Sequence, residues 1–298
     1  MWVVRLKFDA SGPISLSPQK GVRIAMITHS LHDLAAWVAR LSELEIPIFR
    51  DSAEGIAEMI EDDDRASGVA IGRLAQRDPL LTLRILVLAA RHRSSRAVTD
   101  TETAVTAVVM MGLSRFFADF QSPVVVEDLL ADDPVALAGL NEVVRRGHRA
   151  AFFALGFAVH RLDTDAEVIQ EAAMLHDFAE MLMWCRAPGL ARQMLQRQVE
   201  DPGLRSSKAQ LEVFNIKLHD LQRALMRAWH LPELLDQITD RSHMESTRVR
   251  NVVLAVDLAR HTQYGWDNPA IPDDLQAIGT LLNLSPEGAH QKVLALDS

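Results

Sequence analysis

Four residues that can bind a divalent metal lie within segments that are otherwise rich in apolar side chains. They are His148, the adjacent residues His176 and Asp177, and Asp257. Imidazole nitrogen and carboxylate oxygen are ligands that suit zinc, iron and manganese. Such a set, drawn from three helices, leaves room for a metal-bound water. One interpretation is therefore a centre that holds a divalent metal, Fe, Mn or Zn, at these residues.

A structural role is the alternative for His176 and Asp177. The segment from Ala166 to Trp184 predicts one helix that is apolar nearly all round. Adjacent residues on a helix point about 100° apart, so these two side chains are not expected to contact each other. Because an unpaired buried polar group costs a few kcal/mol, each should find a cationic or hydrogen-bonding partner elsewhere. The pattern alone favours partners on neighbouring helices over a metal.

His148 and Asp257 are predicted to face the core. His148 shares a helical stripe with Phe152, Leu155 and Val159. Asp257 lies inside the apolar run VVLAVDLA, where a carboxylate again needs a partner. Both residues would then point toward the interior from helices other than the one that carries His176 and Asp177.

Two further histidines are candidate ligands of the same metal. His219 flanks a stripe of leucines in the segment from residue 218 to 225, and His243 follows a short predicted helix. Each is either a fifth or sixth ligand or an ordinary surface histidine. The surface interpretation is the more common one for histidines in such positions.

The composition indicates a mostly helical chain and excludes several functions. Of its 298 residues, 48% are hydrophobic and 5% aromatic, and the abundant Ala, Leu and Arg are strong helix formers. A net charge of -9 argues against bulk electrostatic binding of nucleic acid or of an anionic membrane. Apolar runs of about ten residues are too short to cross a bilayer. The single cysteine, Cys185, favours a reducing compartment, and we expect a cytoplasmic location.

The N-terminal segment differs from the rest of the chain. The alternation of Trp2, Val4, Leu6 and Phe8 with polar neighbours predicts a short strand, with which residues 22–27 pair in a hairpin-like element. A helix follows from about residue 29 to 44, and Pro47 marks a boundary near residue 45. Helices separated by caps and prolines continue to the C-terminus. An exposed strand edge at Trp2 would favour a homodimer.

Five segments in a fixed order resemble the HDOD family, the HD-related output domain of bacterial signalling proteins. The segments are IPIF at 46–49, IGRLAQRDPLLTLRIL at 71–86, AVTAVVMMGL at 104–113, AMLHDFAEMLMW at 173–184 and LMRAWHLPELL at 225–235. The order His148, His176-Asp177, Asp257 is similar to the H, HD, D pattern of the wider HD superfamily of metal-dependent phosphohydrolases. The resemblance implies a mainly α, multi-helical bundle over residues 46–245, with lobes at about 46–139 and 140–245. Residues 1–45 form an N-terminal extension, and residues 246–298 form C-terminal helices that pack on the second lobe.

This sequence departs from the pattern of catalytic relatives at two places. In active phosphodiesterase relatives, the HD pair is commonly followed by Ile-Gly-Lys, and the lysine assists with phosphate. Here Phe178, Ala179 and Glu180 follow, and a carboxylate repels phosphate. The His-His pair of binuclear relatives is here Ser242 and His243. Both departures agree with the resemblance to the HDOD family, because that family has generally lost catalysis.

Three hypotheses for the function follow. The first is a non-catalytic HDOD signal-transduction protein that acts through a protein partner. The second is a metal-dependent phosphohydrolase, in which a metal-bound water attacks the substrate. The third is a sensor that binds a metal or a nucleotide without turnover, so that binding shifts the packing of helices.

Overall fold

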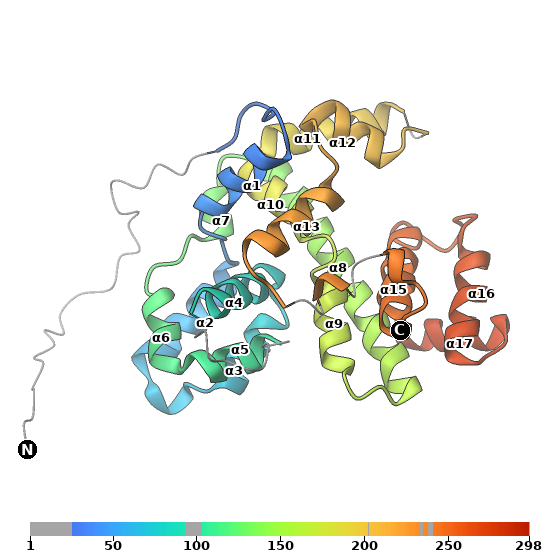
Figure 1. Ribbon diagram of the computed structural model, residues 1–298, viewed down its shortest axis with the longest axis horizontal. Coiled ribbons are helices and arrows are strands. Elements are labelled where there is room, and N and C mark those ends of the chain that lie inside the picture. The colour runs from blue at the N-terminus through green and yellow to red at the C-terminus, as the bar shows by residue number, and fades with distance from the viewer. Residues whose placement is uncertain (1–25, 93–102, 202, 233–234, 238–240, 298) are drawn as a thin grey trace, which may run out of the picture.

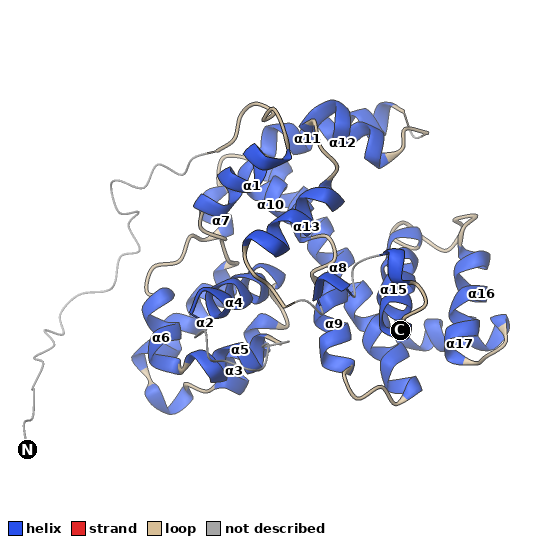
Figure 2. Ribbon diagram, in the orientation of Figure 1, coloured by secondary structure: helices blue, strands red, loops and turns tan. Residues whose placement is uncertain are grey.

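The protein is built of α-helices throughout the part of the chain that the structure describes. The computed structural model describes residues 26–92, 103–201, 203–232, 235–237 and 241–297. These residues contain no β-sheet (Figure 2), and one isolated parallel bridge joins Ile48 to Val125. The predicted mainly α fold is confirmed. Residues 1–25, which include the predicted strand at Trp2, lie outside the described residues, so the strand and the homodimer through it stay predictions.

One group of helices precedes residue 120 and lies at the left of Figure 1. It contains α2 (Arg50–Glu61), α3 (Gly68–Ala75), α4 (Pro79–His92), α5 (Ala104–Met111) and α6 (Leu113–Asp119), with a 3-10 turn at Asp63–Arg65. Helix α3 packs on α4 and on α5, and α4 packs on α5. The short helix α7 (Val126–Leu129) then leads out of this first group.

Asp78 fixes the start of α4 and its position in the first group. Its side chain is buried, and its Oδ1 accepts hydrogen bonds from the backbone N–H groups of Leu80 and Leu81, both at 2.9 Å. Its Oδ2 accepts a third bond, from the N–H of Phe49, at 2.9 Å. One carboxylate thus caps a helix and anchors the segment that begins the family resemblance.

The second group is organised around the long helix α8 (Pro134–Arg161), which begins with Pro134 after the N-cap Asp133. The lobe boundary predicted near residue 140 falls inside this helix. Helices α9 (Ala166–Met174) and α15 (Thr247–His261) pack along α8. The other helices of this group are α10 (Phe178–Arg186), α11 (Pro188–Glu200), α12 (Ser206–Phe214), α13 (Leu218–Ala228), the 3-10 turn Arg241–His243, α16 (Ile271–Leu282) and α17 (Pro286–Asp297).

The predicted core-facing stripe of α8 is wrong. Phe152 and Val159 are 51% and 59% exposed, whereas Phe153 and Phe157 are fully buried. The two buried rings stack with their centroids 6.3 Å apart. Helices α9 and α15 pack on α8. Phe153 and Phe157 therefore belong to the core, and Phe152 and Val159 of the predicted stripe face outward.

The segments before residue 46 and after residue 245 pack on the second group of helices. Helix α1 (Leu34–Glu43) packs on α13, and the Trp37 indole N–H donates a hydrogen bond to the Phe214 carbonyl at 2.9 Å. At the other end, Arg149 of α8 pairs with Asp297 at 2.5 Å. Trp37 and Val293 of α17 belong to the same buried hydrophobic cluster. The described helices therefore share one core.

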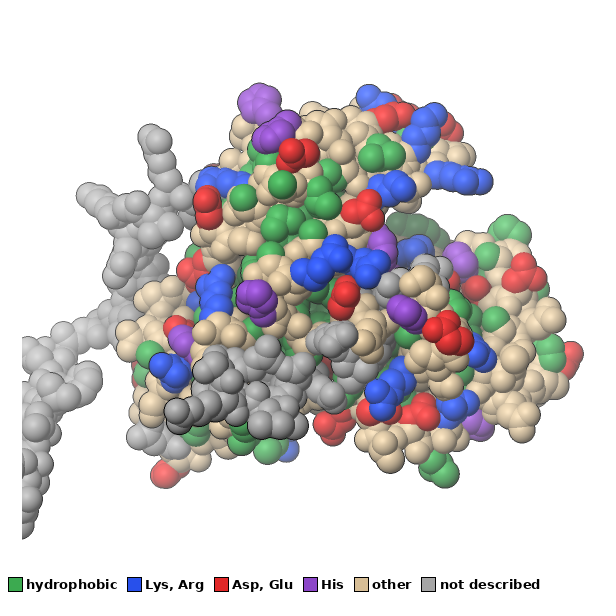
Figure 3. Space-filling view, viewed as in Figure 1, with side chains coloured by type: hydrophobic (Ala, Val, Ile, Leu, Met, Phe, Trp, Pro, Cys, Tyr) green, Lys and Arg blue, Asp and Glu red, His purple; other side chains and the backbone are tan. Residues whose placement is uncertain are grey.

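The outer surface shows no segregation of charge on the face drawn in Figure 3, where acidic and basic side chains are interspersed. None of the described helices has the length and apolar character needed to span a bilayer. Both observations agree with the composition.

The close approach of α8 to α9 depends on Gly147. A Cβ atom at this position would lie 2.9 Å from the backbone oxygen of Met174, so we expect Gly147→Ala to push the helices apart and destabilise the fold by about 1–3 kcal/mol. Gly189 of α11 has open space around its Cβ position, and Gly189→Ala should be neutral or stabilising by about 0.5–1 kcal/mol. Urea unfolding of both variants measures the difference, and equal stabilities would contradict the packing argument.

Candidate functional site

The predicted pair His176 and Asp177 lies in a turn between two helices. Helix α9 ends at Met174 and α10 begins at Phe178, so the single helix predicted from residue 166 to 184 is wrong. Because the chain leaves helical geometry at this turn, the two neighbouring side chains do face each other. The Nδ1 of His176 lies 2.9 Å from the Oδ1 of Asp177. The expectation that they would not contact each other is therefore also wrong.

Two arginines from other helices meet Asp177. From α8, Arg146 donates to the Oδ2 of Asp177 through its Nε at 3.1 Å and one Nη at 2.9 Å. The same Nη donates to Glu180 at 2.7 Å. From α15, Arg260 lies 3.3 Å from the Oδ1 and 3.4 Å from the Oδ2 of Asp177. The expectation of a cationic partner is confirmed, and the cations are guanidinium groups.

These five residues form a cluster, called here the arginine cluster: Arg146, His176, Asp177, Glu180 and Arg260. Burial alone would raise the pKa of Asp177, but Arg260, Arg146 and the hydrogen bond from His176 hold it well below its usual range. Burial lowers the pKa of Arg146, and the attraction of Glu180 and Asp177 more than offsets this, so its pKa is raised. Asp177 is therefore ionised at neutral pH, with both oxygens already engaged by donors.

The predicted metal ligands are not brought together. In the described parts of the chain, no three His, Cys, Asp or Glu side chains lie close enough to hold one metal ion. Among the predicted ligands, His176 and Asp177 contact each other. His219 is exposed on α13, and His243 is exposed and lies 3.2 Å from Glu245. This donor set does not fit the metal that the HD superfamily implies, and the six-ligand site stays a prediction.

His148 and Asp257 lie in different surroundings from each other. Asp257 is on α15, where its charge helps to raise the pKa of Asp274, although burial is the larger cause of that shift. His148 is on α8 beside a small cavity, and its Nε2 is buried without a hydrogen-bond partner. Burial lowers the pKa of His148, and a hydrogen bond to the backbone of Arg77 partly offsets this.

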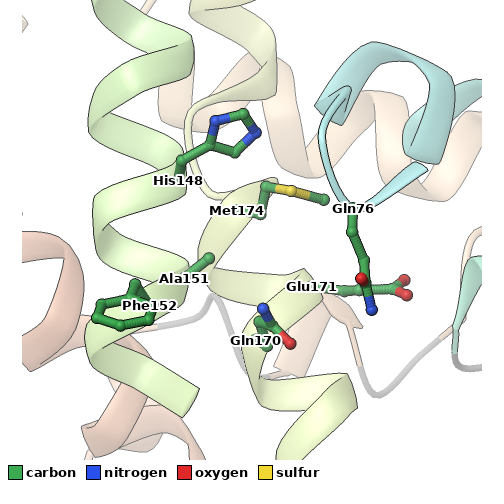
Figure 4. A pocket seen from close by; sticks show the side chains of 7 residues that line it. All are labelled: Gln76, His148, Ala151, Phe152, Gln170, Glu171 and Met174. Carbon is green, nitrogen blue, oxygen red and sulfur yellow. The ribbon is translucent and has the colours of Figure 1, made fainter. Parts of the chain in front are cut away.

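The cavity beside His148 lies between the two groups of helices and has a volume of about 110 Å³. Figure 4 shows Gln76 reaching toward it from the end of α3, and Glu171 from α9. We call it the intergroup cavity, and its lining residues are Gln76, His148, Ala151, Phe152, Gln170, Glu171 and Met174. In Figure 4 the ring of Phe152 points away from the other side chains.

Glu171 is the acidic residue in the lining of this cavity, and its pKa is shifted. Its two carboxylate oxygens accept from the backbone N–H of Ala104, at 3.2 and 3.0 Å, at the start of α5. Burial raises its pKa to about 7, and the nearby charge of Glu167 adds to the effect. The bond to Ala104 joins the first group of helices to the second.

Sequence reasoning did not identify Arg146, Arg260 or Glu171 as residues of a site. Glu171 carries a readable signal, because it is a carboxylate in the same apolar segment as His176 and Asp177. The two arginines occur in helices with many charged residues, and nothing in their spacing marks them as partners of Asp177.

The chain belongs to the HDOD family, since the family model for the HDOD domain matches residues 46–245. The matched range is the one that the sequence resemblance indicated.

Solved structures of similar proteins support the same fold. A response regulator, MmoQ, from Methylococcus capsulatus matches with a TM-score of 0.62 and 19% identity, over 84% of this chain and 98% of that one. A virulence factor from Campylobacter jejuni matches with a TM-score of 0.57 and 15% identity, over 88% and 93% of the two chains. At these identities, the likeness shows the fold alone. A comparison with curated proteins found no match.

Proposed function

We propose that this chain is a non-catalytic HDOD signal-transduction protein that acts through contacts with a partner protein. The observation that carries the proposal is the arginine cluster. Arg146 bridges Asp177 and Glu180, and Arg260 contacts Asp177 from the opposite helix. The HD pair is thus neutralised by the protein's own cations and serves to join α8, α10 and α15.

The energetics of the cluster support this role. The side chains of Arg146 and Asp177 are only 11% and 16% exposed, so breaking their pair would leave charges in a poorly solvated site. A divalent metal at Asp177 would have to displace these donors, and no second carboxylate-histidine pair among the described residues is placed to assist. Glu180 further disfavours a phosphate next to this site, because it is itself an anion.

The signalling part of the proposal is supported by the family. HDOD domains are output domains of signalling proteins, and the MmoQ structure is named a response regulator. With catalysis absent, a regulatory domain transmits a signal through the surfaces that it presents to a partner. A metal-dependent phosphohydrolase and a sensor without turnover are the alternatives that the experiment below separates.

Metal analysis and a turnover assay on the purified chain test the proposal. We expect less than about 0.1 equivalent of Fe, Mn or Zn per chain after purification without chelators. We also expect no hydrolysis of cyclic dinucleotides or generic phosphodiesters when these metals are added. Asp177→Asn serves as the matched control for background hydrolysis. Metal-dependent turnover that this substitution abolishes would overturn the proposal, whereas metal bound without turnover would favour the sensor.

A further inference from the structure

The intergroup cavity is distinct from the arginine cluster. It is lined from α3, α8 and α9, whereas the cluster is built from α8, α15 and the turn before α10. At about 110 Å³ it is somewhat smaller than the cavity of about 150 Å³ that accepts benzene, a ligand of six heavy atoms. It therefore has room for a group of about four or five non-hydrogen atoms.

The polar groups of the cavity include several hydrogen-bond acceptors. Glu171 offers two carboxylate oxygens, and they share a single backbone donor, the N–H of Ala104. Gln76 and Gln170 each add an amide oxygen that accepts and an amide NH2 group that donates. The buried Nε2 of His148 has no partner, and a neutral imidazole carries one nitrogen lone pair.

The absence of a cation distinguishes Glu171 from Asp177. Asp177 is met by two guanidinium groups, but within the described ranges no Lys or Arg side chain lies within ion-pair distance of Glu171. A largely buried carboxylate that no cation contacts has the most to gain from a bound cation that carries several N–H donors.

We propose that the intergroup cavity binds a small organic cation with several N–H donors, namely a guanidinium or primary ammonium group. One edge of the cation would donate to Glu171, and its remaining N–H groups would donate to Gln76, Gln170 or His148. Met174 and Ala151 supply apolar surface for a methyl or methylene group on the cation.

An organic cation fits better than a divalent metal. The lining contains one histidine and one carboxylate, and no group of three such ligands occurs among the described residues. A planar guanidinium has four heavy atoms and donates two parallel hydrogen bonds to a carboxylate. Its size matches the volume of the cavity, and its N–H donors match the carboxylate of Glu171 and the amide oxygens of Gln76 and Gln170.

The bound cation would connect the two groups of helices. Gln76 belongs to the first group, and His148 and Glu171 belong to the second. A ligand that bonds to both sides adds a link to the one already made by Glu171 and Ala104. Binding at this cavity does not depend on whether the protein hydrolyses phosphodiesters.

Isothermal titration with methylguanidinium at millimolar concentration tests the inference. We expect saturable binding to the full chain, and binding at least tenfold weaker to Glu171→Gln. Glu167→Gln removes the same charge from an exposed position one turn away on α9, so its affinity should stay within about twofold of that of the natural sequence. Circular dichroism and thermal unfolding verify that both variants fold.

Two further probes identify the chemistry and the source of the cation. Tetramethylammonium has similar size and charge but no N–H donor, and it should not bind. Free arginine and a short peptide with a central arginine distinguish a free metabolite from a side chain of a partner. Binding of either supports the inference, and a shift of the His148 ring protons in NMR spectra, assigned with His148→Gln, would place it in the cavity. Equal binding to Glu171→Gln, equal binding of tetramethylammonium, or no binding of any donor cation would overturn it.

Discussion

Arg146→Met is expected to destabilise the protein by about 3–5 kcal/mol. The variant removes the cation between Asp177 and Glu180, whose side chains are 16% and 23% exposed. Methionine preserves most of the apolar stem of arginine, so the loss reports on charge and hydrogen bonds more than on volume. Urea unfolding at pH 7 and low salt measures the free energy of unfolding of the variant against that of the natural sequence.

Arg260→Met is the matched control for this prediction. Arg260 contacts the same carboxylate, but its side chain is 44% exposed and its two contacts are 3.3 and 3.4 Å long. Water can replace it, so its loss should cost about 0–1 kcal/mol. Adding Glu180→Gln to Arg146→Met should restore part of the lost stability, because it removes one of the two carboxylates that Arg146 pairs with. Equal effects of the two arginine variants would show that Arg146 is not the central cation.

Asp78 should make the stability of the protein decrease as the pH rises through the range from about 4 to 7. Burial raises its pKa to about 6, although hydrogen bonds from Leu81, Phe49, Ser52 and Leu80 oppose the shift. The folded state therefore holds this proton to higher pH than the unfolded state, and folding is favoured below the unfolded pKa. The contribution is lost as the pH rises through about 6, and it amounts to about 3 kcal/mol.

Asp78→Asn isolates this contribution from those of the other acids. The difference in unfolding free energy between the natural sequence and the variant should shrink by about 3 kcal/mol from pH 4 to pH 7. A pH-independent difference for Asp78→Asn would contradict the argument.

The helical class and the extent of the family domain could be predicted from the sequence because they depend on local patterns. Helix caps such as Ser67 and Asp133, and a proline such as Pro134 at the start of a helix, are local signals of this kind. The position of the HD pair was also readable, since two polar residues in an apolar segment demand partners.

There is a physical reason why the geometry of the His176-Asp177 pair could not be predicted from the sequence. The turn from Leu175 to Asp177 contains neither glycine nor proline, so no local signal interrupts the helical pattern. What ends α9 there is tertiary: the turn places Asp177 against Arg146 and Arg260. Tertiary ion pairs of this kind depend on how whole helices pack, and a single sequence does not contain that information.

The rotation of α8 about its axis illustrates the same limit. Two apolar stripes run along this helix, one with Phe152 and Val159 and one with Phe153 and Phe157. Helical periodicity identifies both stripes equally well. Only the positions of α9 and α15 decide which of them becomes the core.

The contacts of Trp37 with Phe214 and of Arg149 with Asp297 show how much of the chain is needed to complete the hydrophobic core. The family match ends at residues 46 and 245, yet Trp37 and Val293 lie in the same core as the residues between those limits. The segment shared by the family is thus smaller than the unit that buries its apolar surface. Transfer of residues 46–245 alone into another protein would expose Phe214, which Trp37 contacts, and would remove Asp297, the ion-pair partner of Arg149. We therefore expect an independently stable unit of this chain to need α1 and α17 in addition to the segment that its family shares.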